Sequence, residues 1–230
     1  MSAQASIDVL IAAAHRVELG PLSATLSAAP GASSRAERGG VRFALAEIGV
    51  GMTSAGSGMQ AALQRVTPRV VVLVGSFGAY PERGASIGSL LAPSELVAVE
   101  EATLASRAAM PSAMRVRAQT DDAIRTGLLS CAPGAQTGAL ATTLSITTDD
   151  DLAHTLGVRS GCVGENLEAL CVAVACEAAS VPFAALLACT NEVGGSGRSQ
   201  WLAEHARAAE QTCAAVLAFL DRGAPGLRRS

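Results

Sequence analysis

The sequence predicts an α/β protein in which helices cover both faces of a mostly parallel sheet. Apolar runs short enough for buried strands alternate several times with helical segments, a pattern typical of parallel sheets. The chain has 230 residues, 50% of them hydrophobic and 16% charged, so it can bury a sizeable core. Because no repeat, linker or change of composition divides it, residues 1–230 are expected to form a single domain.

Charge and composition limit the classes of partner. The net charge is −3, and the 17 basic residues, all arginine, form no cluster, which argues against nucleic acid. No apolar run reaches the length of a membrane span and no signal-peptide pattern is present, so we expect a cytoplasmic protein without membrane contacts. The six cysteines include no C-x-x-C pair and are expected to be buried thiols without metal.

The first elements follow from apolar runs and turn formers. Ile7–Ala14 is a β-rich apolar run and is predicted to be a central strand. His15–Thr25 follows as a loop leading into a helix, with Glu18 near the carboxyl end of the strand. Residues 29–40 are rich in turn formers and are interpreted as a hairpin connection to the strand Val41–Ile48.

The next segment contains the strongest strand signal. After Gly49-Val50-Gly51, Thr53 is expected to cap a helix that Pro68 ends. Arg69–Gly75 then has five apolar residues in a row and is predicted to be a strand. A glycine-punctuated loop is expected after it, in which Gly75 and Gly78 let the backbone approach a ligand closely.

The middle of the chain gives weaker signals. It is interpreted as strand 89–99, an irregular connection 100–119, helix 121–129, strand 139–146, and helix 148–156 with an acidic first turn.

The stretch from residue 164 to residue 201 organises the prediction of a site. Leu167–Cys176 is predicted to be a buried helix in which Glu168 is the lone charge. Val181–Cys189 reads as a central strand, after which Asn191 emerges where open α/β sheets bind ligands. The final helix is expected at Trp201–Asp221. A carboxylate beside a carboxamide at a strand end predicts a small-molecule site.

Common nucleotide and hydrolase motifs are absent from the sequence. Glycines after Gly49 and Gly51 fail the G-x-G-x-x-G spacing, because Ser54 occupies the third position. The chain has no GK[ST] phosphate loop. Gly75-Ser76-Phe77-Gly78 is not the G-x-S-x-G nucleophile elbow.

Four motifs instead carry a resemblance to a known family. They are GVG at 49–51, VGSFGAYPERGASIGS at 74–89, GENLEALCVAVAC at 164–176 and TNEVGGSGRSQW at 190–201. The chain resembles the nucleoside phosphorylase/nucleosidase superfamily, and within it most resembles futalosine hydrolases of the menaquinone pathway. The resemblance implies a three-layer α/β/α fold with a central mixed sheet, hydrolysis of a purine nucleoside, no metal or organic cofactor, and a homodimer.

The resemblance also implies roles for individual residues. Glu168 would bind the ribose 2′- and 3′-hydroxyls, Asn191 would contact the purine near N7, and Glu18 would orient the attacking water. The carboxamide, in place of the aspartate of methylthioadenosine nucleosidases, favours a 6-oxopurine such as hypoxanthine. The expected substrate-binding residues are Gly75, Ser76, Phe77, Gly78, Ile146 and Leu167.

Each of these residues also has a structural interpretation. Glu168 suits the first turn of a helix, Asn191 a turn, and Glu18 a solvated loop. Phe77 and Ile146 could be core residues, and Trp201 is expected to pack the preceding loop onto the last helix.

Several positions depart from the family pattern. They are Leu187 in place of an arginine, Ser196-Gly197 in place of Arg-Asp, Phe77 in place of glycine, and Ser89 in place of aspartate. The alternatives that stay open are a methylthioadenosine/adenosylhomocysteine nucleosidase, a phosphate-dependent purine nucleoside phosphorylase, and a non-catalytic nucleoside-binding protein.

Overall fold

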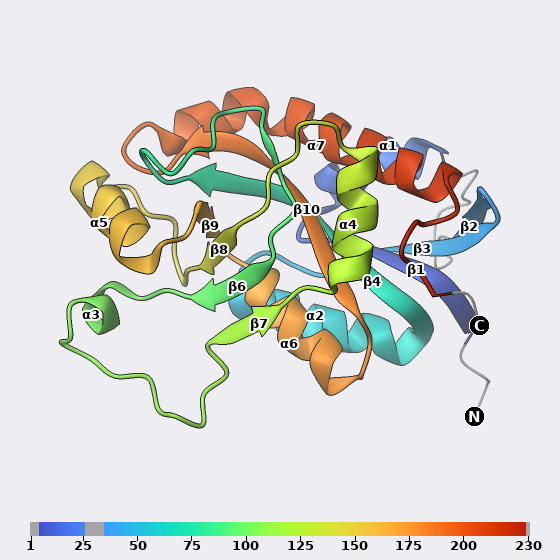
Figure 1. Cartoon of the computed structure of the whole chain (residues 1–230), viewed down its shortest axis with the longest axis horizontal. Coiled ribbons are helices and arrows are strands. Elements are labelled where there is room, and N and C mark those ends of the chain that lie inside the picture. Colours follow the sequence, from blue (N-terminus) through green and yellow to red (C-terminus); the bar gives the residue numbers. More distant parts are fainter. Residues whose placement is uncertain (1–4, 26–34, 229–230) are drawn as a thin grey trace.

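The computed structural model describes residues 5–25 and 35–228, and within them a mixed sheet lies between two layers of helices (Figure 1). The strands are β1 (Ala5–Ala13), β2 (Arg35–Arg38), β3 (Val41–Glu47), β4 (Val66–Ala79), β5 (Leu90–Leu91), β6 (Glu95–Ala98), β7 (Arg117–Gln119), β8 (Ala139–Thr142), β9 (Gly164–Asn166) and β10 (Phe183–Glu192). The helices are the 3-10 helix η1 (Arg16–Leu19) and the α-helices α1 (Gly20–Thr25), α2 (Met52–Arg65), α3 (Glu101–Leu104), α4 (Asp122–Cys131), α5 (Asp150–Ser160), α6 (Ala169–Ala178) and α7 (Gly197–Asp221). The predicted α/β/α class with a mixed sheet is confirmed.

The sheet is organised around the long strand β4. It pairs in parallel with β1 along its first half and with β10 along its second half. At its carboxyl end β4 also pairs antiparallel with β9, which continues the sheet through β8, β6 and β7. The carboxyl ends of β1, β4 and β10 therefore meet at one edge, where open α/β sheets bind ligands.

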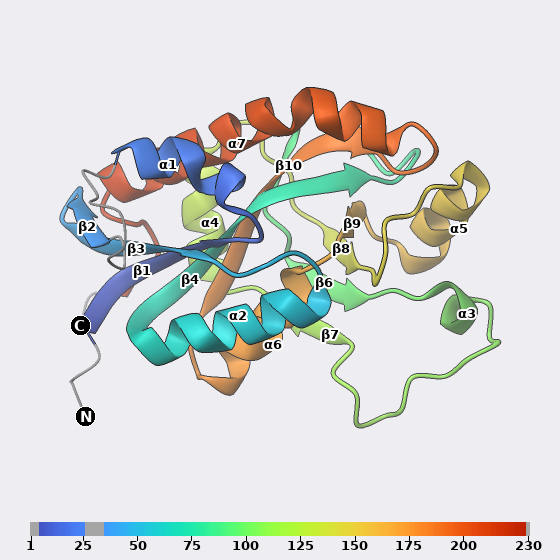
Figure 2. The same ribbon diagram turned by 180° about the vertical axis from the view of Figure 1, so that it is seen from behind.

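Helices cover the two faces of the sheet with separate apolar cores. Helices α2 and α6 cover one face, and α7 with α1 and α4 covers the other, as the two opposite views show (Figures 1 and 2). The first core includes Met59, Leu73 and Leu170, and the second includes Val72, Leu186 and Phe219. Every one of these side chains is almost fully buried. Burial of this apolar area on both faces is the main stabilising contribution to the fold.

Strand β4 differs from its prediction at both ends. The helix before it ends at Arg65, and Pro68 lies inside the strand, where it pairs with Ile7. The glycine-punctuated stretch Gly75–Gly78, predicted as a loop, continues the strand because β10 pairs with it on one side and β9 on the other. Pairing with distant strands overrides the local preference of glycine for turns.

Other expectations also need correction. Strand β8 ends at Thr142, so Ile146 lies in an irregular segment and not in a strand. Residues 89–99 form two short strands, β5 and β6, in place of one. The stretch 100–119 was expected to be irregular, and it contains the short helix α3 and strand β7. The hairpin expected at residues 29–40 lies partly outside the described residues, but Arg35–Arg38 pairs antiparallel with β3.

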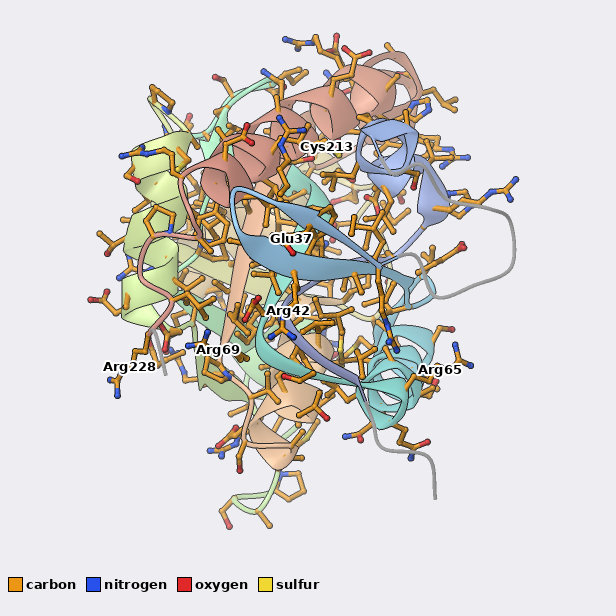
Figure 3. All side chains as sticks on the ribbon, turned by 90° about the vertical axis from the view of Figure 1, so that its right-hand side faces the viewer. Glu37, Arg42, Arg65, Arg69, Cys213 and Arg228 are labelled. Carbon is orange, nitrogen blue, oxygen red and sulfur yellow. The ribbon has the colours of Figure 1, made fainter. Side chains whose placement is uncertain are left out.

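An ionic cluster lies near the starts of β1, β3 and β4, at the edge of the sheet opposite to the carboxyl ends of these strands. Asp8 near the start of β1 accepts hydrogen bonds from the backbone and side chain of Arg42 and from the side chain of Arg69. Figure 3 views this side of the molecule and labels both arginines. Within residues 5–25 and 35–228, no helix has the length and hydropathy needed to cross a bilayer.

Candidate active site

A cavity of about 400 Å³ opens at the carboxyl ends of β1, β4 and β10. Its walls come from η1, the end of β4, strand β9, the segment 143–149, the end of β10 and the first turns of α7. The volume falls in the range of small-molecule sites, and the walls are mostly apolar with a few convergent polar groups. All nine residues predicted to form the site line this cavity: Glu18, Gly75, Ser76, Phe77, Gly78, Ile146, Leu167, Glu168 and Asn191.

Glu18 is placed by the turn that follows β1. His15 is the N-cap residue of η1. Its Nδ1 accepts the Val17 N–H, and the Glu18 carboxylate accepts the His15 N–H at 3.1 Å, so the two residues form a capping box. The carboxylate approaches β4 closely, because a Cβ at Gly75 would lie 3.0 Å from Glu18 Oε1. Gly75 therefore leaves room for this acid.

Glu168 lies immediately before α6, and not inside a helix as predicted. Asn166 Oδ1 accepts the N–H groups of Glu168 and Ala169 at 2.7 and 2.8 Å, and Asn166 Nδ2 donates to the Ser76 carbonyl at 3.1 Å. This amide thus starts α6 and ties it to β4. The Glu168 carboxylate accepts the Gly51 N–H at 2.8 Å.

That contact also corrects the predicted cap of α2. The helix begins at Met52 with Gly51 as its N-cap residue, and no cap hydrogen bond comes from Thr53. Glu168, 117 residues away in sequence, supplies the acceptor for the Gly51 N–H. A carboxylate at a helix N-terminus is electrostatically favourable, so part of the Glu168 charge is stabilised by α2.

The acids of the cavity form no ion pair with the described residues. None of the salt bridges formed by the described residues involves Glu18, Glu165 or Glu168, although all three line the cavity. Burial, together with the charge of Glu168, raises the pKa of Glu18 from 4.5 to about 7. Burial also raises the pKa of Glu168 above its ordinary range. Buried carboxylates that lack an ion-pair partner favour a ligand that carries or develops positive charge.

Asn191 reaches the cavity from the end of β10, inside the strand and not in the loop after it. A bulge at Thr190 shifts the register, so that Asn191 pairs with Gly78. Asn191 Nδ2 donates to the Glu192 carbonyl at 2.9 Å, and Thr190 Oγ1 lies 2.8 Å from Asn191 Oδ1. Because a carbonyl can only accept, the amide nitrogen must face Glu192 and the amide oxygen must face the Thr190 hydroxyl.

Close approach explains the glycine opposite this amide. A Cβ at Gly78 would lie 2.9 Å from Asn191 Nδ2 and 2.9 Å from Val193 Cγ2. Real Cβ atoms almost never come so near, so a larger residue at position 78 would displace the amide. The sequence signal for backbone approach at Gly78 thus reflects packing against a site residue.

Helix α7 supplies a wall that the sequence did not predict. Trp201 lines the cavity, stacks on His205 with ring centroids 4.7 Å apart, and carries the Arg198 guanidinium 4.9 Å above its ring. The helix begins at Gly197, earlier than the expected Trp201. Trp201 was expected only to pack the preceding loop onto this helix, but it also forms part of the cavity wall. Arg198 lies within the motif at 190–201 but was given no role there, and His205 lies outside the four motifs.

Two further polar residues of β9, Glu165 and Asn166, also escaped prediction. Both line the cavity. They stand beside Glu168 in the GENLE motif, but alternation within a three-residue strand cannot be recognised from sequence. Their hydrogen-bond partners are distant in sequence: Glu165 bonds to Thr147, 18 residues away, and Asn166 bonds to Ser76, 90 residues away.

Leu187, which departs from the family pattern, does not line the cavity. It is fully buried in β10, pairs with Gly75 and Leu91, and belongs to the core that α2 and α6 cover. Leu187 therefore contacts the apolar core beneath the site and does not add to the residues that line the cavity.

Several solved structures share the fold of this chain. The 5′-methylthioadenosine/S-adenosylhomocysteine nucleosidase of Neisseria meningitidis, solved with methylthio-immucillin-A, superposes with a TM-score of 0.82 at 16% identity, covering 94% of this chain and 99% of that one. A futalosine hydrolase mutant of Helicobacter pylori gives a TM-score of 0.83 at 14% identity, with the same two coverages. The S-adenosylhomocysteine nucleosidase of Streptococcus pyogenes gives 0.82 at 18% identity, covering 97% of this chain and 100% of that one.

These TM-scores establish a shared fold of the purine nucleosidase type. No sequence match is found among proteins with curated descriptions. A family model described as the phosphorylase superfamily, however, matches residues 10–221, nearly the whole chain. The chain therefore belongs to the phosphorylase superfamily.

Proposed function

We propose that the protein hydrolyses the N-ribosidic bond of a purine nucleoside, and that the substrate is futalosine, which yields hypoxanthine and dehypoxanthinyl futalosine in menaquinone biosynthesis. The observation that carries this proposal is the shared cavity of Glu18, Glu168 and Asn191. These groups come from the ends of β1, β9 and β10, so only the fold brings them together.

The acidic side of the cavity suits a sugar that becomes cationic. As the C1′–N9 bond breaks, its electron pair moves to the base and the ribose gains oxocarbenium character. Glu168, buried and held by the Gly51 N–H, would accept hydrogen bonds from the ribose hydroxyls. Its negative charge would stabilise the transition state more than the neutral ground state.

Hydrolysis, as opposed to phosphorolysis, is supported by the charges around the sugar. A phosphate site needs several cationic groups, whereas Arg198 is the only arginine among the described residues that line the cavity. Glu18 would instead hold a water molecule. Water oxygen forms the new bond to C1′, Glu18 takes the water proton, and the purine anion takes a proton at a ring nitrogen from solvent.

The orientation of Asn191 supports a 6-oxopurine. Thr190 occupies the amide oxygen and Glu192 takes one N–H, so the second N–H of the same nitrogen remains for a ligand. Both N7 and O6 of hypoxanthine accept hydrogen bonds. The amino group at C6 of adenine is a donor and would meet this N–H unfavourably, which is the argument against methylthioadenosine as the preferred substrate.

A second candidate function is non-catalytic binding of a nucleoside. Phe77, which lines the cavity where relatives have glycine, is the observation that favours it. Leu187 gives it no support, since that side chain lies in the core and not in the cavity.

The deciding experiment incubates the purified protein with futalosine, aminodeoxyfutalosine, inosine and methylthioadenosine, with and without phosphate, and measures released base by chromatography. We expect hypoxanthine from futalosine at a rate independent of phosphate. A strict requirement for phosphate would establish the phosphorylase instead. Tight binding of a nucleoside without any base release would establish the binding protein.

The proposal includes a cytoplasmic homodimer. Large apolar side chains near the site are exposed, Leu144 at 81% and Leu202 at 55%, and association of two copies would cover such groups. Light scattering after gel filtration should give twice the monomer mass of 23.1 kDa.

A further inference from the structure

A third carboxylate in the cavity wall takes no part in the chemistry proposed above. Glu165 lies in β9, opposite Gly78 of β4, and its side chain is buried with 6% of its surface exposed. It accepts three hydrogen bonds: from the Thr147 N–H at 2.9 Å, from the Thr147 hydroxyl at 2.8 Å and from the Tyr80 hydroxyl at 3.0 Å. Two of these three donors belong to one residue of the segment 143–149.

The middle of that segment is exposed, although Thr143 and Thr147 are buried. The segment connects β8 to α5 without regular structure and carries Ile146 in the cavity wall. Leu144 is 81% exposed and Ile146 is 54% exposed, so burial of apolar side chains does not fix the middle of the segment. Its first residue donates from Thr143 N to the Asn166 carbonyl at 3.1 Å. Next to these exposed residues, Thr147 is tied to Glu165 by two hydrogen bonds.

The donors suit an ionised carboxylate. Each of the three groups has a proton to give, and a carboxylate accepts on both oxygens. Burial of Tyr80 and the nearby charge of Glu165 raise the pKa of the phenol, so this hydroxyl keeps its proton and donates. Burial raises the pKa of Glu165 as well, while the contacts from Thr147 and Tyr80 act in the opposite direction. Hydrogen bonds to a charged acceptor are stronger than those between neutral groups.

We propose that Glu165 is a positioning residue for purine recognition: through Thr147 it holds the segment 143–149, and with it Ile146, against the base-binding end of the cavity. The inference rests on the proposed function only in taking a purine as the ligand. Glu165 would support base binding equally in the ground state and the transition state. Loss of its hydrogen bonds to Thr147 should therefore weaken base binding and raise KM with little change in kcat.

Three variants separate this function from general stability. Thr147→Val keeps the shape of the side chain and removes one donor from the segment. Thr147→Ser restores that donor. Tyr80→Phe is the matched control, because it removes a hydrogen bond from the same carboxylate without touching the segment.

The measurements are KM and kcat for base release, the dissociation constant of hypoxanthine, and amide hydrogen exchange at Thr147. The chain has one tryptophan, and Trp201 lines the cavity, so its fluorescence can report binding. We expect Thr147→Val to raise KM and the hypoxanthine dissociation constant by roughly tenfold, the scale of one hydrogen bond to a charged group. Thr147→Ser should behave like the wild type, and Tyr80→Phe should change both constants less than threefold. Glu165→Gln should speed exchange of the Thr147 amide.

Unchanged hypoxanthine affinity in Thr147→Val, or equal losses in Thr147→Val and Tyr80→Phe, would overturn the inference. If the wild type binds hypoxanthine but releases no base from any nucleoside, the proposed function fails alone. The binding and exchange measurements then still decide whether Glu165 positions the segment.

Discussion

The two ends of the cavity differ in charge: one carries acids and the other a neutral amide. At one end, Glu18 and Glu168 are acids held by backbone N–H groups, with no cation among the described residues paired to them. At the other end, Asn191 is a neutral amide whose orientation is set by Thr190 and the backbone. The first arrangement is suited to stabilising charge that develops in a reaction, and the second to discriminating between bases. Mutations at the two ends should therefore change different kinetic constants.

The largest effect is expected from Glu168→Gln. Removing the charge beneath the ribose while keeping the side-chain shape should lower kcat about 100-fold or more, on the scale of a lost preorganised transition-state contact. Glu177→Gln is the matched control, since Glu177 is an exposed acid on α6 that pairs with Arg115. Equal rates for wild type and Glu168→Gln would remove Glu168 from the chemistry.

A slightly smaller effect is expected at Glu18, and it should depend on pH. The pKa of Glu18 is about 7, so a base at this position becomes ionised as the pH rises through 7. The value of kcat/KM should rise up to that pH and then level off. Glu18→Gln should abolish this inflection and lower the rate roughly 100-fold, in the range for general bases. A pH profile with the same inflection in Glu18→Gln would assign it to another group.

The same substitution should stabilise the fold at high pH. Because the pKa of Glu18 is raised above its ordinary 4.5, folding favours the neutral acid, and stability falls as the pH rises from about 4.5 to about 7. Glu18 is partly exposed, so we expect Glu18→Gln to gain on the order of 2 kcal/mol at pH 8 and almost nothing at pH 4. Urea unfolding at the two pH values measures the difference. A gain of equal size at both would show that charge is not its cause.

At the neutral end, Asn191→Asp should change base preference by about tenfold. A carboxyl oxygen accepts from the 6-amino group of adenine, while the carbonyl oxygen of hypoxanthine meets it unfavourably. The ratio of kcat/KM for methylthioadenosine over futalosine measures the shift. Asn191→Ala is the control, because it removes the N–H that favours hypoxanthine without adding an acceptor for the 6-amino group, so it should shift the ratio less than Asn191→Asp does.

The smallest effect is expected far from the cavity. Burial of Asp8 raises its pKa, but hydrogen bonds from Arg42 and Arg69 outweigh this, so the pKa is lowered overall. Its stabilisation is therefore present at neutral pH and is lost as the pH falls below the ordinary value of 3.8. Asp8→Asn should cost roughly 1 kcal/mol at pH 7, the scale of partly exposed ion pairs, with kcat unchanged. Thermal unfolding and base release measure the two quantities, and a loss of kcat would connect this edge to the site.

Sequence patterns sufficed for the central strands, whereas most residues expected in the site came from the resemblance to a known family. The apolar runs of β1, β4 and β10 are buried on both faces of the sheet, so hydrophobicity alone predicts them. The motifs around Glu168 and Asn191 predicted a common cavity because each follows or precedes a recognisable element.

The sequence by itself determined the α/β class and the central strands, and it predicted an acid and an amide near the ends of strands. Only the tertiary structure decided that Gly75–Gly78 is strand, that Glu168 caps α2 at Gly51, and that Glu165 holds Thr147. These features depend on hydrogen bonds between residues distant in sequence. Local propensity and periodicity contain no information about such partners, because these residues come into contact only when the chain has folded.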